Sequence, residues 1–286
     1  MSTHPPTIDR PTRHDPALVI GGTGTTGRRV AKRLAARGVP HRVGSRRASP
    51  AFDWQRPEGW PAVLAGMPQA YVAYHPDLAF PGATDHIARL TRAAAEAGLT
   101  RLVLLSGRGE PAAEECERIV QGSGLAWTVL RCSWFAQNFS ESFFLPPVLD
   151  GALRIPAADA VEPFVDADDI ADVAVAALTE PGHGGEVYEL SGPRALGFAE
   201  VAAILSEATG RSIAYQPVSH AAYAEELAAQ GLPADFADLF ALVLDGRNAT
   251  PTDGVRRALG RPPRDFADYA RATAATGVWQ PAAVAR

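Results

Sequence analysis

The sequence predicts an α/β protein with a doubly wound parallel sheet, followed by a smaller, mainly helical subdomain. Apolar runs alternate with amphipathic helical patterns from residue 17 to residue 131, as in parallel strands joined by crossover helices. A glycine-rich stretch, VIGGTGTTGR (19–28), separates the first strand pattern from the first helix pattern. After Arg131 the alternation breaks into an aromatic-rich segment, Trp134 to Phe144, and helical patterns then dominate.

The elements of the first half follow from hydrophobic periodicity. Residues 17–20, ALVI, form an uninterrupted apolar run, which is typical of a strand buried on both faces. Gly38 and Gly98 each follow a helical pattern, where glycine commonly terminates a helix. We expect strands at 17–21, 41–45, 70–74, 101–106 and 126–131, and helices at 26–37, 84–97 and 112–122.

The second half combines short strand patterns with longer helical ones. We expect isolated strands at 163–166, 185–191 and 212–218, and helices at 167–179, 197–209, 219–230, 234–245 and 265–275. Residues 1–16 are polar and proline-rich, which indicates a disordered tail. The chain is thus predicted to consist of this tail, a sheet domain (17–150) and a C-terminal subdomain (151–286), some of whose segments return to the sheet.

Composition restricts the class of protein. The 286 residues carry a formal net charge of −5 without a basic stripe, which argues against nucleic acid as the main partner. No run of about 18 apolar residues and no signal-peptide pattern occurs, so we expect no membrane partner and a cytoplasmic location. Cys116 and Cys132 are the two cysteines, without further ligands at metal-site spacing, and we expect two reduced, mostly buried thiols and no metal.

The glycine-rich stretch predicts a dinucleotide site. Between a buried strand and a helix, Gly22, Gly24 and Gly27 match the spacing that allows a tight turn, close approach to a pyrophosphate and close packing of the helix. A plain glycine-rich turn is the alternative. The sheet domain is therefore expected to be of Rossmann type, and the expected phosphate-binding residues are Gly21, Gly22, Thr23, Gly24, Thr25, Thr26 and Gly27.

The end of the second strand predicts which nucleotide binds. No Asp or Glu lies between Gly27 and Asp53; instead Ser45, Arg46 and Arg47 follow the strand. A carboxylate at this place selects a free ribose 2′-hydroxyl, whereas arginine accommodates a 2′-phosphate. We therefore predict NADPH/NADP as the cofactor, with a solvated basic turn as the alternative. The remaining expected cofactor contacts are Asp53, Tyr74, His75, Ser106 and Ser133.

Several motifs, in order, resemble the NmrA-like, atypical short-chain dehydrogenases/reductases, and within them the festuclavine/agroclavine dehydrogenase-like group of the ergot alkaloid type. They are GGTGTTGRRVA (21–31), FDW (52–54), LVLLSG (102–107), SGLAWTVLRCSWFAQNF (123–139), PFVDADDIADVA (163–174) and GRPPRDFADYA (260–270). The resemblance implies an NADP(H)-binding Rossmann domain with a pocket beside a C-terminal subdomain. Cys132, Ala136 and Gln137 depart from the family's usual proline, methionine and glutamate, which affects the substrate rather than the cofactor.

The chain lacks the usual proton donor of short-chain dehydrogenases. That donor is a tyrosine four residues before a lysine, but Lys32 is the sole lysine and no tyrosine lies between Tyr74 and Tyr188. Ser106 and His75 are the candidate catalytic residues; a structural hydroxyl and a histidine placed for backbone reasons are the alternatives. Most of the acidic residues 110, 114, 115 and 117 are expected on a solvated helix face.

These observations predict a reductase of restricted substrate range. Without a donor, the favoured acceptors are an iminium ion, whose product is neutral, and a quinone or enone, whose product anion is delocalised. We expect an NADPH-dependent oxidoreductase of specialised metabolism, a monomer or homodimer, acting on a small apolar molecule. The alternatives are a nonenzymatic NADP(H)-sensing regulator and a redox-neutral isomerase or cyclase. The expected pocket residues are Trp134, Phe135, Asn138 and Phe143, with Phe144 as a further aromatic candidate.

Overall fold

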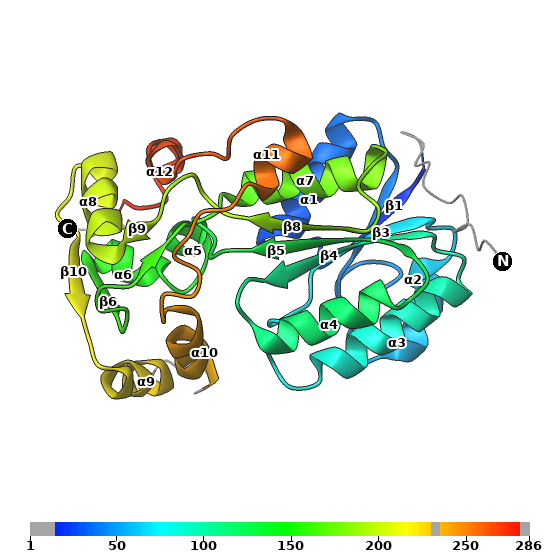
Figure 1. Ribbon diagram of the computed structural model, residues 1–286, viewed down its shortest axis with the longest axis horizontal. Helices are drawn as coiled ribbons and strands as arrows, with labels where there is room; N and C mark the ends of the chain where they lie inside the picture. The colour runs from blue at the N-terminus through cyan, green and yellow to red at the C-terminus, as the bar shows by residue number, and fades with distance from the viewer. Residues whose placement is uncertain (1–14, 230–234, 281–286) are drawn as a thin grey trace, which may run out of the picture.

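A computed structural model describes residues 15–229 and 235–280 and contains the predicted parallel sheet. Its six strands are all parallel, in the order β2-β1-β3-β4-β5-β8, and they lie at the centre of the larger part of the molecule (Figure 1). The strands are β1 (Ala17–Ile20), β2 (His41–Gly44), β3 (Gln69–Val72), β4 (Arg101–Gly107), β5 (Ala126–Cys132) and β8 (Glu186–Leu190).

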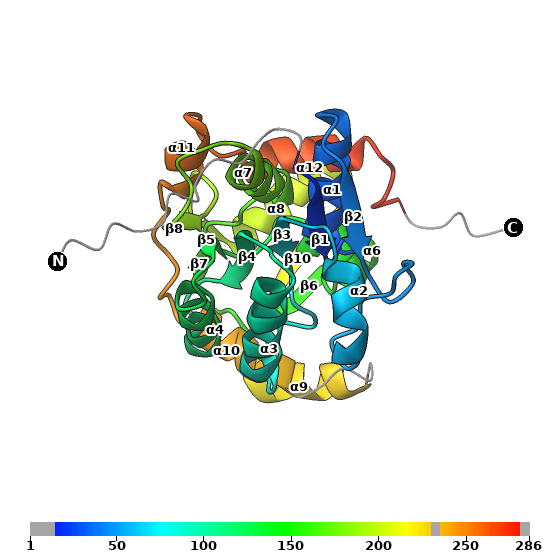
Figure 2. The same cartoon turned by 90° about the vertical axis from the view of Figure 1, so that its right-hand side faces the viewer.

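Helices cover both faces of this sheet (Figure 2). One layer contains α1 (Thr25–Ala36), α7 (Ala167–Thr179) and α11 (Gly254–Leu259); the other contains α2 (Trp60–Leu64), α3 (Ala83–Glu96) and α4 (Pro111–Gln121), with the 3₁₀ turn η1 (Pro57–Gly59). Because successive strand residues point to opposite faces, Val19 packs in the core under α1 and α7, whereas Leu18 and Ile20 pack in the core under α3. Both faces of the sheet are therefore dry, as the continuous apolar strands require.

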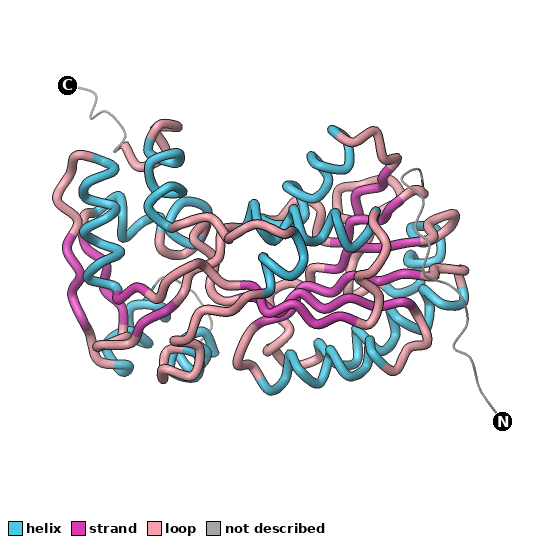
Figure 3. The backbone as a smooth tube through the Cα atoms, turned by 45° about the horizontal axis from the view of Figure 1, so that its top comes forward, coloured by secondary structure: helices cyan, strands magenta, loops and turns pink. Residues whose placement is uncertain are grey.

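The smaller region lies beyond the carboxyl ends of the main strands, and Figure 3 shows its short strands apart from the main sheet. A third core of aromatic side chains, including Phe139, Phe164, Phe198 and Phe266, holds it together. Its strands form two pairs, β6 (Ala152–Ile155) with β10 (Ala214–Pro217), and β7 (Val161–Glu162) with β9 (Leu196–Gly197). Its helices are α5 (Asn138–Glu141), α6 (Leu145–Asp150), α8 (Phe198–Thr209), α9 (His220–Ala229), α10 (Asp235–Val243) and α12 (Phe266–Ala274).

The fold class is confirmed, with corrections in the second half. The expected strand at 163–166 is wrong: only Val165 forms a bridge, to Phe135, because Pro163 has no N–H to donate and Asp166 already caps α7. The strands expected at 185–191 and 212–218 are not isolated, since β8 pairs with β5 at the edge of the main sheet and β10 pairs with β6.

The predicted domain boundary after residue 150 stays a prediction. The chain returns to the main sheet after it, through α7 and β8. Nearly all of the predicted tail, and residues 230–234 at the expected ends of two helices, lie outside the described residues. Among the residues that are described, no helix combines the length and hydropathy that crossing a membrane requires.

An ion-pair network joins α1 to α7. Arg33 of α1 bonds Asp168 at 2.6 Å and also bonds Asp172 of α7. The other carboxylate oxygen of Asp172, Oδ2, accepts hydrogen bonds from Arg261 and Arg264, which precede α12. These ion pairs therefore connect α1, which follows the glycine-rich stretch, to α7 and, through Asp172, to the segment before α12.

Candidate active site

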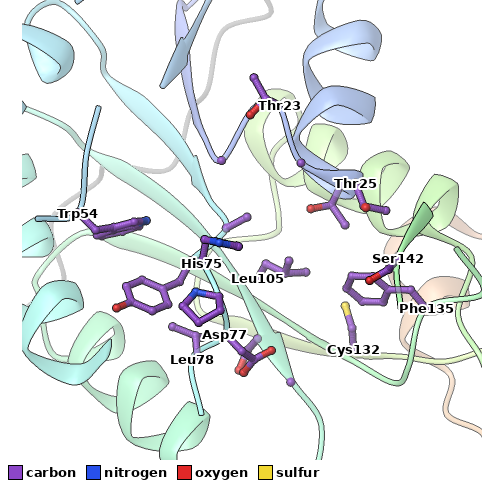
Figure 4. A pocket seen from close by; sticks show the side chains of 18 of the residues that line it. Thr23, Thr25, Trp54, His75, Asp77, Leu78, Leu105, Cys132, Phe135 and Ser142 are labelled. Carbon is purple, nitrogen blue, oxygen red and sulfur yellow. The ribbon is translucent and has the colours of Figure 1, made fainter. Parts of the chain in front are cut away.

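A cavity of about 760 Å³ extends along the carboxyl ends of the main strands. It runs from the glycine-rich loop, past the ends of β2, β3, β4 and β5, to aromatic side chains of the smaller region. In Figure 4, Thr23 and Thr25 of the loop lie above it, with Trp54 and His75 toward one end and Phe135 and Ser142 toward the other. This edge of a parallel sheet is where ligands of α/β proteins bind.

The glycine-rich loop has a backbone that side chains could not follow. Gly21 has a φ of +75°, and a Cβ there would lie 2.7 Å from the carbonyl oxygen of Ala73. A Cβ on Gly27 would lie only 2.2 Å from the carbonyl oxygen of Gly21, so Gly27 allows α1 to pack against the loop. Gly24 precedes α1 without a side-chain cap, and the first turn holds no acidic residue. The loop thus presents the start of a helix, with its positive dipole end, to the cavity.

Twelve of the expected cofactor contacts line the cavity and three do not. Gly22, Gly27 and Arg47 lie outside the lining: both glycines act in packing, and Arg47 is exposed. The lining residues are Gly21, Thr23, Gly24, Thr25, Thr26, Ser45, Arg46, Asp53, Tyr74, His75, Ser106 and Ser133. Thr26 is buried, and its hydroxyl accepts a hydrogen bond from Tyr71 at 2.9 Å, which directs it into the protein.

The end of β2 presents arginine to solvent. Arg46 lines the cavity and is exposed, and within the described residues no carboxylate forms an ion pair with Arg46 or Arg47. Asp53 lies across the same end of the cavity, where its carboxylate accepts a hydrogen bond from the Gln55 backbone at 3.0 Å. A guanidinium that has no protein partner can bind a phosphate with its planar donor groups.

A cluster of aromatic side chains forms the next wall. Trp54 packs on Tyr74 with 4.7 Å between ring centroids, and the Tyr74 hydroxyl is 2.8 Å from Nδ1 of His86. His75 is exposed at the rim and precedes Pro76. Its catalytic role stays a prediction.

Ser106 is held by a buried acid. Its hydroxyl donates a 2.6 Å hydrogen bond to Oε1 of Glu117, whose side chain is 1% exposed. Arg131 also donates to both oxygens of Glu117, and this contact raises the pKa of Arg131. The Ser106 hydroxyl therefore donates its hydrogen bond to a carboxylate within the protein.

Two acidic side chains that the helix pattern placed on a solvated face lie in the site instead. The expectation that residues 110, 114, 115 and 117 mostly face solvent holds for Glu114 and Glu115 but is wrong for Glu110 and Glu117, which are 6% and 1% exposed. Glu110 is the residue before α4 and points into the cavity beside Asp77. Burial and then the neighbouring Asp77 raise the pKa of Glu110 to about 9, and burial raises the pKa of Asp77 as well.

The far wall of the cavity is aromatic. All four expected substrate contacts, Trp134, Phe135, Asn138 and Phe143, line it, whereas Phe144 is 1% exposed and belongs to the core instead. Phe240 of α10 completes this wall, 4.6 Å from Trp134 and 5.4 Å from Phe143 between ring centroids. Cys132 lines the cavity and Cys116 is buried, and both are free thiols as predicted.

Curated proteins resemble this chain over nearly its whole length, although no family model matches it. It is 33% identical to an NAD(P)H azoreductase of Xenophilus azovorans over 90% of this chain and 98% of that protein. It is 31% identical to agroclavine dehydrogenase of Claviceps fusiformis over 88% of this chain and 95% of that protein.

A solved structure shares the fold. Triphenylmethane reductase of Citrobacter sp., complexed with NADP(H), has a TM-score of 0.70 and 22% identity over 91% of this chain and 99% of that one. The chain belongs to the NmrA-like family of atypical short-chain dehydrogenases/reductases, together with the azoreductase and the agroclavine dehydrogenase.

Proposed function

We propose that this protein is an NADPH-dependent reductase that transfers hydride to a small, mostly apolar, conjugated acceptor of specialised metabolism: a quinone, an enone or an iminium ion. The observation that carries the proposal is the continuity of the cavity, which joins the glycine loop and Arg46 to the aromatic wall around Trp134. One end suits a phosphorylated dinucleotide and the other suits a flat apolar molecule. Both relatives are named for reductase or dehydrogenase activity, which supports the same class of reaction.

The residues at the first end fit a dinucleotide. The positive φ of Gly21 and the absent side chain of Gly24 leave the loop backbone open, and the uncapped start of α1 suits a pyrophosphate. Ser45 and Arg46 would hold the adenosine 2′-phosphate, which favours NADPH over NADH. When bound, the cofactor supplies the hydride.

The residues at the second end position the acceptor and exclude water. Trp134, Phe143 and Phe240 pack edge to face, so they offer apolar ring faces and edges without a competing charge. An acceptor held there would meet the cofactor in a dry, fixed orientation, which can contribute several kcal/mol to the rate. A regulator that merely senses the dinucleotide has no need of this second, apolar half of the cavity, and its presence therefore favours an enzyme.

The test is NADPH oxidation by the purified protein with a panel of quinones, enones, cyclic iminium compounds and, because of the azoreductase relative, azo dyes. We expect turnover with at least one class and the reduced product in equal amount to the NADPH consumed. Tight binding of NADPH and NADP⁺ without turnover would instead support the regulator. Product formation with only catalytic NADP⁺ would support a redox-neutral isomerase or cyclase.

A further inference from the structure

Two carboxyl groups meet at the floor of the cavity. Asp77 follows β3 and Glu110 follows β4, and these strands are neighbours in the sheet, so both side chains reach the same edge. In Figure 4 the Asp77 side chain lies below His75 and to the left of Cys132. Neither residue belongs to the nucleotide-binding loop or to the aromatic wall.

The pair has no positive partner. Across residues 15–229 and 235–280, no arginine, lysine or histidine forms an ion pair with Asp77 or Glu110. Two arginines at the carboxyl ends of β4 and β5 are occupied: Arg131 binds Glu117 and Glu189, and Arg108 binds Glu189 and the carbonyl oxygens of Asn248 and Thr250.

Glu110 also carries an unsatisfied atom. Its Oε2 is buried, and no described N–H or hydroxyl donates to it, although buried polar atoms are normally paired. Asp77 is better supported, since the backbone N–H of Ala79 donates to its carboxylate at 2.8 Å. Glu110 therefore has an oxygen whose hydrogen-bonding capacity the described protein groups leave unused.

The backbone makes room for this arrangement. Glu110 folds back over Gly107 at the end of β4, where a Cβ would come to within 2.2 Å of Oε2. Any other residue at position 107 would displace the carboxyl group. Glycine at position 107 thus serves the placement of Glu110 beside Asp77, rather than a turn that needs positive φ.

Two carboxylates in contact and without a cation repel each other strongly when both are ionised, so such pairs retain one proton between them. The other groups that face the pair do not relieve this repulsion: Glu117 adds negative charge, and Cys116 and Cys132 are neutral thiols whose pKa values are raised by burial.

We propose that Asp77 and Glu110 share one proton and donate it to the acceptor atom that becomes electron-rich when the acceptor takes up hydride. This rests on the proposed function. In an enone or azo compound, hydride adds to one atom of the double bond with two electrons, and the atom at the other end of the conjugated system takes the proton from the carboxyl O–H. The pair, now doubly ionised, regains a proton from water. An iminium acceptor needs no such proton, because hydride alone makes it a neutral amine.

Few hydroxyl groups near the cavity could replace the carboxyl pair as proton donor in the way that the tyrosine of other short-chain dehydrogenases does. Tyr71 is fully buried and donates to Thr26, and the Ser106 hydroxyl donates to Glu117. Among the described residues, Tyr74 is the tyrosine that lines the cavity, and its hydroxyl lies beside His86. The experiment must therefore include Tyr74.

The variants are Glu110→Gln and Asp77→Asn, which keep the side-chain shape but remove the shared proton. Glu114→Gln, on the exposed face of the helix α4 that Glu110 precedes, is the matched control. At saturating NADPH we expect both variants to lower kcat for an enone or azo acceptor by about 10²- to 10⁴-fold, the usual contribution of a positioned acid. Their kcat for an iminium acceptor and their Kd for NADPH should stay close to those of the wild type.

A second measurement does not depend on turnover. At about pH 8, where Glu162 with its pKa of about 7 is mostly ionised and Glu110 with its pKa of about 9 is not, the infrared spectrum should contain the C=O band of a buried protonated carboxyl, sensitive to H/D exchange. Both single variants should lose it, and Glu114→Gln should keep it.

Four results would overturn the inference. They are an unchanged enone or azo kcat in folded Glu110→Gln, an equal loss with the iminium acceptor, no carboxyl band in the wild type, or the full loss reproduced by Tyr74→Phe. If the wild type reduces no acceptor while the band is present, the proposed function fails and the shared proton is structural, which also overturns donation to a substrate. If the wild type turns over and the band is absent, only the present inference fails.

Discussion

The hydroxyl of Ser106 donates to Glu117, with 2.6 Å between Oγ and Oε1, and thereby binds a strand end to the buried face of α4. A serine at this strand end would be expected to contact substrate. In the structure its hydroxyl instead donates a hydrogen bond to an internal carboxylate that Arg131 also binds.

Replacing this serine should therefore cost stability more than catalysis. Ser106→Ala leaves the Glu117 carboxylate with one donor fewer, and we expect a loss of about 1–3 kcal/mol in the free energy of unfolding. Chemical denaturation measures the loss, and kcat should fall by less than about tenfold, a barrier change of about 1.4 kcal/mol. A much larger fall in kcat with unchanged stability would show that Ser106 acts on the substrate.

Arg46 should decide between the two nicotinamide cofactors. Arg46→Glu removes charge-assisted hydrogen bonds to the 2′-phosphate and adds repulsion, so we expect the Kd for NADPH to rise by about 10- to 100-fold. The Kd for NADH, measured by the same fluorescence titration, should change little.

Arg47→Glu is the matched control, since Arg47 is equally exposed but lies outside the cavity lining. Equal weakening of NADPH and NADH by Arg46→Glu would contradict the assignment of the 2′-phosphate.

Gly27 should tolerate no side chain. In Gly27→Ala the methyl group would overlap the carbonyl oxygen of Gly21, so α1 or the loop must move. We expect a loss of about 1–3 kcal/mol in stability, as for other overpacked sites, together with weaker NADPH binding. Gly122→Ala is the control, because its Cβ would meet only ordinary contacts, the closest at 3.4 Å. Equal melting temperatures and equal affinities for the two variants would refute this account of Gly27.

Stability should fall as the pH rises, because of Glu110. Burial and Asp77 raise the pKa of Glu110 from 4.5 to about 9 in the folded protein. Across this window the folded state holds a proton that the unfolded chain has released, so rising pH favours unfolding. We expect the wild-type melting temperature to fall between about pH 5 and about pH 9, and that of Glu110→Gln to fall less.

Some slope should remain in the variant, since burial also raises the pKa of Glu162 to about 7. Glu114→Gln, whose side chain is exposed, should follow the wild type. Parallel curves for all three proteins would disprove the shifted pKa of Glu110.

Local patterns were sufficient to predict the sheet. The apolar composition of residues 17–20 and of most of 101–106 by itself indicates buried strands. The glycine spacing at 21–27 reflects a backbone conformation that few other residues can adopt. For the same reason, Arg46 after β2 and the aromatic residues after β5 could be assigned to a cofactor end and a substrate end before the shape of the cavity was known.

The rest of the site depends on contacts between distant segments. Phe240 comes from a helix about 100 residues beyond Trp134, and no local pattern connects them. Helical periodicity separates the faces of α4 but does not reveal that Glu110 turns inward over Gly107. One signal was present: Asp77 and Glu110 each follow closely on a parallel strand, where side chains from neighbouring strands converge.

The arginines that bind Asp168, Asp169 and Asp172 have a consequence for engineering. Arg33 approaches this acidic face of α7 from the nucleotide-binding side, and Arg264 approaches it from the C-terminal side, where it binds the fully buried Asp169. A transplant of the glycine loop with α1 alone into another scaffold would leave acidic side chains without their counter-charges. In a chimaera, the smallest unit that can be exchanged intact therefore includes α1, α7 and the segment before α12, although some 230 residues of chain separate its ends.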